Sequence, residues 1–269
     1  MPYILETVEY RNGAIKDIRK YFSANFGKKL PKSPRSGVSS EAMKRVNREH
    51  AIRTLEGDII ENFDENDVFV ALTYGSMNPV PDEERARKDI EDFQRKARRF
   101  FAKQGEEHKY IHVPEYSGRR PHHHVIMKGI KPGDLKKLWS HGNVRITPLW
   151  GKGNYRKLAE YLVNRAEEEA LRSGKTNQKR WNSSKNLKKP KTTKEVIESK
   201  SWRSMPKAPK EYYIEGNNVE NRINEFDGRP MQFYRLMRLE EKSSGKNRRG
   251  YDKVLRGCKS RSGTGDERV

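Results

Sequence analysis

Residues 109–129, KYIHVPEYSGRRPHHHVIMKG, decide how the middle of this chain is expected to fold. Two runs rich in β-branched and aromatic side chains, 109–116 and 121–129, are separated by a short segment of serine, glycine and arginine. This pattern is typical of two strands joined in an antiparallel hairpin. We therefore expect residues 109–115 to pair with residues 122–128.

This pairing predicts a cluster of three side chains that bind metals. Glu115 would lie opposite His122, and cross-strand neighbours are about 5 Å apart at Cβ. Successive side chains on a strand point to opposite faces, so His122 and His124 share one face while His123 points to the other. Two imidazoles and one carboxylate suit a divalent cation that keeps positions open for a substrate phosphate.

A polar, solvated sheet face is the alternative explanation for adjacent histidines. We favour the metal site because a carboxylate joins the two imidazoles in register. The other histidines are interpreted as structural, and His112 has the wrong strand parity to join the cluster; they are His50, His108, His112 and His141.

The residues around the hairpin predict an α+β fold. In chain order we expect a strand at 67–74, a helix at 81–105, the two hairpin strands, a helix at 132–142, a strand at 143–150 and a helix at 154–174. This βαββαβα order predicts an antiparallel sheet with helices on one or both faces, of the ferredoxin or RNA-recognition-motif type.

Composition divides the chain into three parts. Residues 1–64 are expected to form a loop and a helical arm, with the helix over 41–63. Residues 65–174 hold the βαββαβα core. Residues 175–269 carry most of the positive surplus and are expected to be a partly disordered, basic, DNA-binding extension.

The formal net charge of +21 points to a polyanionic partner, most often nucleic acid. The single cysteine, Cys258, excludes an intrachain disulfide framework and a cysteine-rich zinc ribbon. We find no apolar run of membrane-spanning length and no signal core, so we expect a cytoplasmic protein without a membrane partner. The sequence contains no phosphate-loop motif of the G-x-x-x-x-G-K-[ST] type, so we do not expect a built-in motor of that class.

The basic candidates for contact with nucleic acid flank the hairpin and follow the last core helix. We expect phosphate contacts from cations and base stacking from tryptophan, either Trp181 or Trp202. The candidate residues are Arg119, Arg120, Arg165, Lys179, Arg180, Trp181, Lys185, Lys188 and Lys189.

The helix over 154–174 carries two tyrosines. Tyr155 lies near the centre of the apolar stripe, which predicts core packing. Tyr161 lies at the border of the stripe, near Lys157 and Arg165, where a hydroxyl can reach a site on the sheet. Its alternative interpretation is an ordinary boundary aromatic.

Three segments taken together resemble the HUH endonucleases of the rolling-circle replication initiator type, found in phages and plasmids. They are VFVALTY (68–74), YIHVPEYSGRRPHHHVIM (110–127) and YRKLAEYLVN (155–164); SSKNLKKP (183–190) is also similar to a stretch of such proteins. The resemblance implies that His122 and His124 bind the metal with Glu115. It makes Tyr161 the nucleophile. Asn164 stands where the family often has lysine, a role that passes to Lys157 or Arg165.

The resemblance implies metal-dependent cleavage of one DNA strand at an origin. Mg²⁺ or Mn²⁺ would orient the scissile phosphate, and Tyr161 would become joined to the 5′ phosphate, leaving a 3′ hydroxyl before later rejoining. The partners would be single-stranded DNA or an origin hairpin, with a separate helicase and DNA polymerase.

Other functions remain open from sequence. A small transposase of the same class is one alternative, and a conjugative relaxase that uses Tyr3 or Tyr10 is another. A non-catalytic DNA- or RNA-binding protein on the same fold is the third.

Overall fold

The computed structural model describes seven ranges of the chain: residues 2–23, 41–76, 79–116, 119–149, 153–174, 179–224 and 228–239. Cys258 and the basic stretch beyond residue 239 lie outside these ranges, as do residues 117–118 in the turn of the predicted hairpin.

The predicted α+β core is confirmed, with its elements in the expected order. One five-stranded antiparallel sheet, here called the hairpin sheet, has the strand order β6-β3-β5-β4-β7. Its strands are β3 (Val68–Thr73), β4 (Tyr110–Glu115), β5 (His122–Met127), β6 (Val144–Pro148) and the two-residue β7 (Asn182–Ser183).

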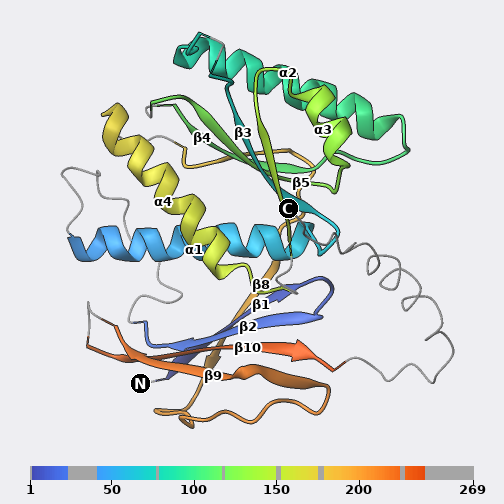
Figure 1. The fold of residues 1–269 in the computed structure, drawn as a ribbon. Helices are drawn as coiled ribbons and strands as arrows, with labels where there is room; N and C mark the ends of the chain where they lie inside the picture. Colours follow the sequence, from blue (N-terminus) through green and yellow to red (C-terminus); the bar gives the residue numbers. More distant parts are fainter. Residues whose placement is uncertain are drawn as a thin grey trace, which may run out of the picture.

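Two helices cover one face of the hairpin sheet, α2 (Glu83–Ala102) and α3 (Pro132–Leu138) (Figure 1). Asp82 caps α2 by accepting a hydrogen bond from the backbone N–H of Arg85, and acidic residues in the first turn favour the helix dipole. Apolar side chains recur along α2 at helical spacing and pack with Trp139 and the sheet into one hydrophobic cluster; they include Ala86, Ile90, Phe93 and Phe101.

The other face of the hairpin sheet packs on α1 (Glu41–Asn62) and α4 (Arg156–Ser173). Helix α1 confirms the helix expected at 41–63. In Figure 1 these two helices form a layer between two sheets. A single core cluster joins side chains from both sheets and both helices, among them Tyr10, Leu55, Ile126 and Leu162.

The second sheet corrects the expectation of a loop at the N-terminus. It has the order β8-β1-β2-β10-β9, all antiparallel, and combines strands from the first and last described parts of the chain. The strands are β1 (Tyr3–Tyr10), β2 (Ile15–Tyr21), β8 (Lys191–Ile197), β9 (Tyr212–Ile223) and β10 (Pro230–Arg238). Strands β8, β9 and β10 come from the segment expected to be a partly disordered basic extension, so part of that segment is regular sheet. Strand β8 is hardest to recognise in the sequence, because it is mostly polar and exposed.

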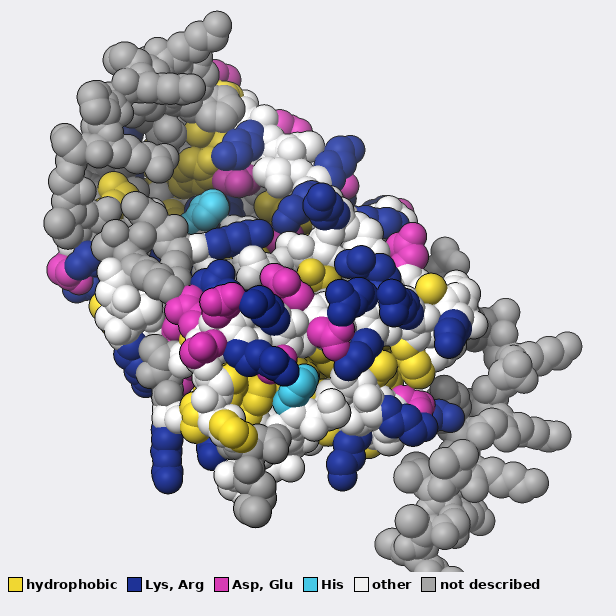
Figure 2. Space-filling view, turned by 90° about the horizontal axis from the view of Figure 1, so that it is seen from above, with side chains coloured by type: hydrophobic (Ala, Val, Ile, Leu, Met, Phe, Trp, Pro, Cys, Tyr) yellow, Lys and Arg dark blue, Asp and Glu magenta, His cyan; other side chains and the backbone are white. Residues whose placement is uncertain are grey.

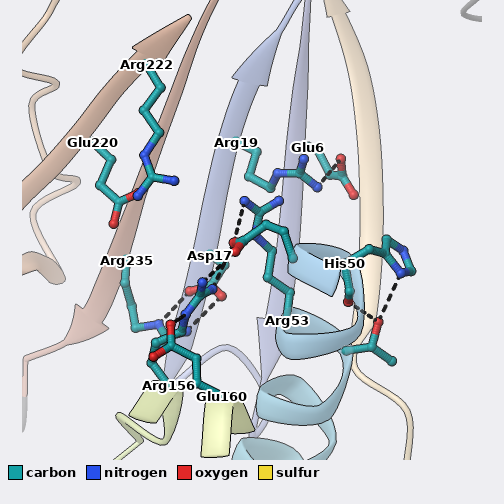
Figure 3. Close-up of polar contacts among 12 residues, drawn as sticks. Glu6, Asp17, Arg19, His50, Arg53, Arg156, Glu160, Glu220, Arg222 and Arg235 are labelled. Carbon is teal, nitrogen blue, oxygen red and sulfur yellow. Dashed lines mark hydrogen bonds and ion pairs between the residues drawn. The ribbon is translucent and has the colours of Figure 1, made fainter. Parts of the chain in front are cut away.

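Buried charges fasten the second sheet to α1. Arg235 of β10 bonds both carboxylate oxygens of Asp17 on β2, at 2.6 and 2.9 Å, and Glu56 of α1, at 2.9 Å. In Figure 3, Arg235 and Asp17 lie together in the middle of a group of arginines, with Arg19 and Arg222 above them and Arg156 below. Because all three side chains are buried, losing any one of them would leave an uncompensated charge between the two layers.

Among the helices that the structure describes, none is both long and apolar enough to cross a membrane.

Candidate functional site

The hairpin has the register that the sequence predicts. Glu115 pairs with His122, Val113 with His124, and the strands β4 and β5 are antiparallel. The carboxylate Oε2 of Glu115 lies 3.4 Å from Nε2 of His124. The cross-strand pairing thus brings one acid and one imidazole into contact, with the second imidazole on the same face.

Tyr161 of α4 lies directly against this pair. Its ring meets the His124 ring edge-to-face, with 5.5 Å between centroids, and the side chain is 40% exposed. Tyr161 is therefore both adjacent to the imidazole and accessible from solvent. Tyr155, by contrast, is buried in the core, as its place in the apolar stripe predicts.

Phe69 of β3 packs against both His124 and Tyr161. It was not among the residues predicted from the sequence. Its ring stacks on His124 at 5.9 Å and meets Tyr161 edge-to-face at 6.2 Å. Strand alternation puts Phe69 and Ala71 on one face, but only the pairing of Ala71 with His124 in the structure brings Phe69 to the site. Phe69 fixes both rings without supplying a chemical group.

Two arginines on α4 hold the carboxylate of Glu115. Oε1 of Glu115 lies 3.4 Å from Arg172 and 4.0 Å from Arg165. These arginines stand four and eleven residues after Tyr161, a spacing that puts all three on one helix face. Arg172 was not predicted, although this spacing reveals it.

Burial controls the protonation of the site. Burial lowers the pKa of His124, and the neighbouring Glu115 carboxylate opposes that change. The imidazole is thus neutral near pH 7, the form that binds metal ions. Burial raises the pKa of Tyr161, while the Arg165 and Arg145 guanidinium groups lower it. Arg145 of β6 was not predicted.

The ring nitrogens test whether a metal fits here. Nδ1 of His122 and Nδ1 of His124 are both buried without a hydrogen-bond partner. Buried polar atoms usually have hydrogen-bond partners. Two unpartnered imidazole nitrogens on one strand face therefore fit a metal ion that binds imidazole nitrogen. In the described ranges, however, no three His, Cys, Asp or Glu side chains lie close enough together to form a metal-binding group.

His123 points to the opposite face, as its parity predicts. It is fully buried, and its ring nitrogens lie 3.2 Å from His112 Nε2 and 3.3 Å from the hydroxyl of Tyr74. His108 is likewise buried and bonds Gln94 at 2.7 Å. These contacts are those of packed, structural histidines.

Several of the predicted DNA-binding cations form hydrogen bonds or ion pairs with other groups of the chain. Arg120 donates to the carbonyl oxygens of Gly75 and Ser76, at 2.9 and 3.1 Å. The ammonium of Lys189 bonds both carboxylate oxygens of Asp58, at 2.8 Å. Arg180 and Arg165 form ion pairs with Glu167 and Glu168 at 3.4 and 2.9 Å, respectively.

The other predicted cations are exposed as well. Arg119, Lys157, Lys179, Lys185 and Lys188 are all exposed. The tryptophans are engaged by the fold itself, because Trp181 packs on the core cluster and the Trp202 ring stacks at 5.3 Å on Phe22.

Residues 67–169 match the model of the family Replication-associated protein ORF2/G2P. The match supports a replication-associated protein. It covers less than half of the chain, but it spans β3 to most of α4 and so includes Glu115, His122, His124 and Tyr161. All strands of the second sheet lie outside it. No curated protein and no solved structure matches the chain.

Proposed function

We propose that this protein initiates phage- or plasmid-type DNA replication by nicking one strand at an origin, with Tyr161 as the nucleophile. One observation carries the proposal. Glu115 contacts His124 across the hairpin, and the ring of Tyr161, which is 40% exposed, packs against that imidazole. A phenol beside a face that could bind a metal ion is an arrangement suited to phosphodiester transesterification.

Every bond made or broken in the proposed reaction belongs to Tyr161 or to the DNA. The phenolic oxygen of Tyr161 attacks the phosphorus of the scissile phosphodiester, and the bond from phosphorus to the 3′ oxygen breaks. The phenolic proton ends on that 3′ oxygen, and the 5′ phosphate stays joined to Tyr161. The reverse attack by a 3′ hydroxyl rejoins the strand without ATP.

Glu115, His122 and His124 would hold the divalent cation, Mg²⁺ or Mn²⁺. When bound, it polarises the phosphate and orients it for attack. The orphaned ring nitrogens of both histidines support this assignment. Arg172 and Arg165 form ion pairs with the Glu115 carboxylate and orient it toward the site.

The tyrosine needs nearby positive charge, because burial raises its pKa above the ordinary value near 10. Arg165 supplies it, since its guanidinium lies 5.4 Å from the centre of the Tyr161 ring. Between Lys157 and Arg165, this contact favours Arg165 as the cation that assists the phenolate.

The basic surface would hold the DNA mainly through its phosphates. Figure 2 shows Lys and Arg side chains crowded over the face seen from above, with acidic groups among them. The proposed partners are single-stranded DNA or an origin hairpin, with a separate helicase and a DNA polymerase.

The test is covalent adduct formation between purified protein and a labelled origin oligonucleotide with Mn²⁺. Tyr161→Phe should abolish the adduct, while Tyr155→Phe, which removes a buried hydroxyl from the start of the same helix, should retain it. The proposal fails if Tyr161→Phe still forms the adduct. His122→Ala and His124→Ala should lose metal-dependent nicking and keep salt-sensitive DNA binding.

Two further outcomes would change the assignment. Salt-sensitive binding by a wild-type protein that never nicks would indicate a non-catalytic DNA- or RNA-binding protein. A cleavage site mapped to a transposon end or a transfer origin would indicate a transposase or a relaxase.

A further inference from the structure

A cavity of about 740 Å³ opens at the edge of the hairpin sheet, where β4 and β7 meet α2. Its walls include His112, Pro114 and Tyr116, which lie on the face of β4 opposite Glu115. Strand β7 pairs with β4 only at Ile111 and His112, so among the described residues no strand pairs with the end of β4 nearest Glu115 on this side. The cavity thus lies on the opposite face of the sheet from Glu115, and the residues on either side of Glu115 in the sequence line it.

Positive charge dominates the wall of the cavity. Three arginines of α2 and one lysine face two acids; the lining cations are Arg87, Arg95, Arg98 and Lys179, and the acids are Glu91 and Glu169. Arg87 and Arg95 are paired with Glu83 and Asp92 on their own helix. Arg98 and Lys179 have no hydrogen bond or ion pair within the described ranges, so their charges are available to an anion.

A neutral donor and aromatic walls accompany these charges. Gln94 lines the cavity and is 6% exposed. Its carbonyl Oε1 is taken by His108 at 2.7 Å, whereas its amide Nε2 is buried with no partner. A buried, unpaired donor requires an acceptor. Tyr110 and Tyr116 add aromatic surface to the same wall.

Cations, aromatic rings and an unpaired amide in one cavity match the three parts of a nucleotide: phosphate, base face and base edge. The volume lies in the range of sites that bury a small ligand. Bases inside a duplex are stacked on one another, so only an unpaired strand can place a base against protein aromatics. The position beside Glu115 puts the cavity on the path of a strand that leaves the proposed active site.

We propose that this cavity binds a nucleotide of the single-stranded DNA that flanks the scissile phosphate, an inference that rests on the proposed function. Arg98 and Lys179 receive the phosphate, Gln94 donates to the base edge, and the tyrosines contact the base. The contribution is to affinity and to placement of the strand, and not to the chemical step.

The test compares Arg98→Glu with Arg99→Glu by fluorescence anisotropy of a labelled oligodeoxythymidylate, without added metal. Both side chains are exposed and neighbours on α2, and both changes alter the net charge equally, but Arg99 does not line the cavity. Arg98→Glu should weaken binding about tenfold or more and reduce the salt slope by about one, while Arg99→Glu changes affinity less than about twofold.

A second variant tests the base contact. Tyr116→Leu should weaken binding roughly fivefold or more, because base–aromatic stacking contributes at least that much. Equal effects of Arg98→Glu and Arg99→Glu would overturn the proposal. Displacement of the oligonucleotide by thymidine monophosphate at comparable concentration would assign the cavity to a free nucleotide and overturn the strand assignment.

Failure here is separable from failure of the proposed function. If the cavity is not used, the two α2 variants bind alike while the wild type still forms the Tyr161 adduct. If nicking is wrong, no adduct forms, but the difference in binding between the two variants persists.

Discussion

Replacing Arg235 by methionine should strongly destabilise the protein. The guanidinium is 7% exposed and donates to Asp17, Glu56 and the carbonyl oxygen of Gly153. Methionine fills a similar volume but leaves two buried carboxylates without their counter-ion. The attachment of the second sheet to α1 should therefore weaken first.

The magnitude follows from the burial of all three charges. Removing one member of a buried ion pair costs about 3–5 kcal/mol, since the remaining charge is left uncompensated. Two buried carboxylates, Asp17 and Glu56, would lose their counter-ion here. Protonation of a carboxylate removes its charge and so limits the loss of stability. Burial already raises the pKa of Glu56 and Arg235 opposes the rise, so without Arg235 this pKa increases further. We expect a loss of about 3–5 kcal/mol near pH 7, shrinking relative to wild type as pH falls and Glu56 becomes neutral.

Urea unfolding followed by circular dichroism measures this loss. The matched control is Arg222→Met, which makes the same change in charge and volume at a side chain that is 58% exposed and pairs with Glu220 at 2.8 Å. This control should lie within about 0.5 kcal/mol of wild type. Adding Glu56→Gln to Arg235→Met should recover part of the loss.

The reasoning would be refuted by an Arg235→Met variant as stable as Arg222→Met. It would also be refuted if the difference from wild type grew as pH fell, because that would place the penalty on a group other than the buried carboxylates.

Three further predictions concern single residues. Gly142→Ala should cost about 1–3 kcal/mol of unfolding free energy, since its Cβ would lie 2.3 Å from backbone atoms at the end of β3, whereas Gly133→Ala, with open space around it, should not. Burial lowers the pKa of His108 to about 4, so below pH 6.5 the unfolded chain binds a proton that the folded chain does not; stability should fall by about 1.4 kcal/mol per pH unit down to pH 4, and urea unfolding of His108→Phe should lack this slope. Arg165→Met should raise the pKa of Tyr161 and move the pH profile of adduct formation to higher pH; an unchanged profile would exclude Arg165 as the assisting cation.

Local pattern was sufficient for the hairpin and its register. Strand alternation and a short turn bring Glu115 and His122 opposite each other, and these signals lie within a few residues of one another. The helix of Tyr161 was equally accessible, because its apolar stripe shows which side faces the sheet. The α+β core was predicted from such short-range information.

The second sheet was beyond that kind of reasoning. Its strands β1 and β8 are separated by most of the chain, and β8 is largely polar and exposed, so β8 carries no strong apolar period of its own. Tertiary pairing stabilises them, and the Arg235 contacts to α1 and β2 become visible only once the layers meet.

By itself, then, the sequence determined which strands of the central hairpin pair, which faces their histidines take, and which tyrosine borders the sheet, because these properties depend on neighbours along the chain. Only the tertiary structure decided that Arg172 and Arg165 hold Glu115, that Phe69 supports Tyr161, and that a cationic cavity lies around the sheet edge. Such contacts depend on the distance between helices and strands that pack together from remote parts of the chain, and that distance is set by the whole core.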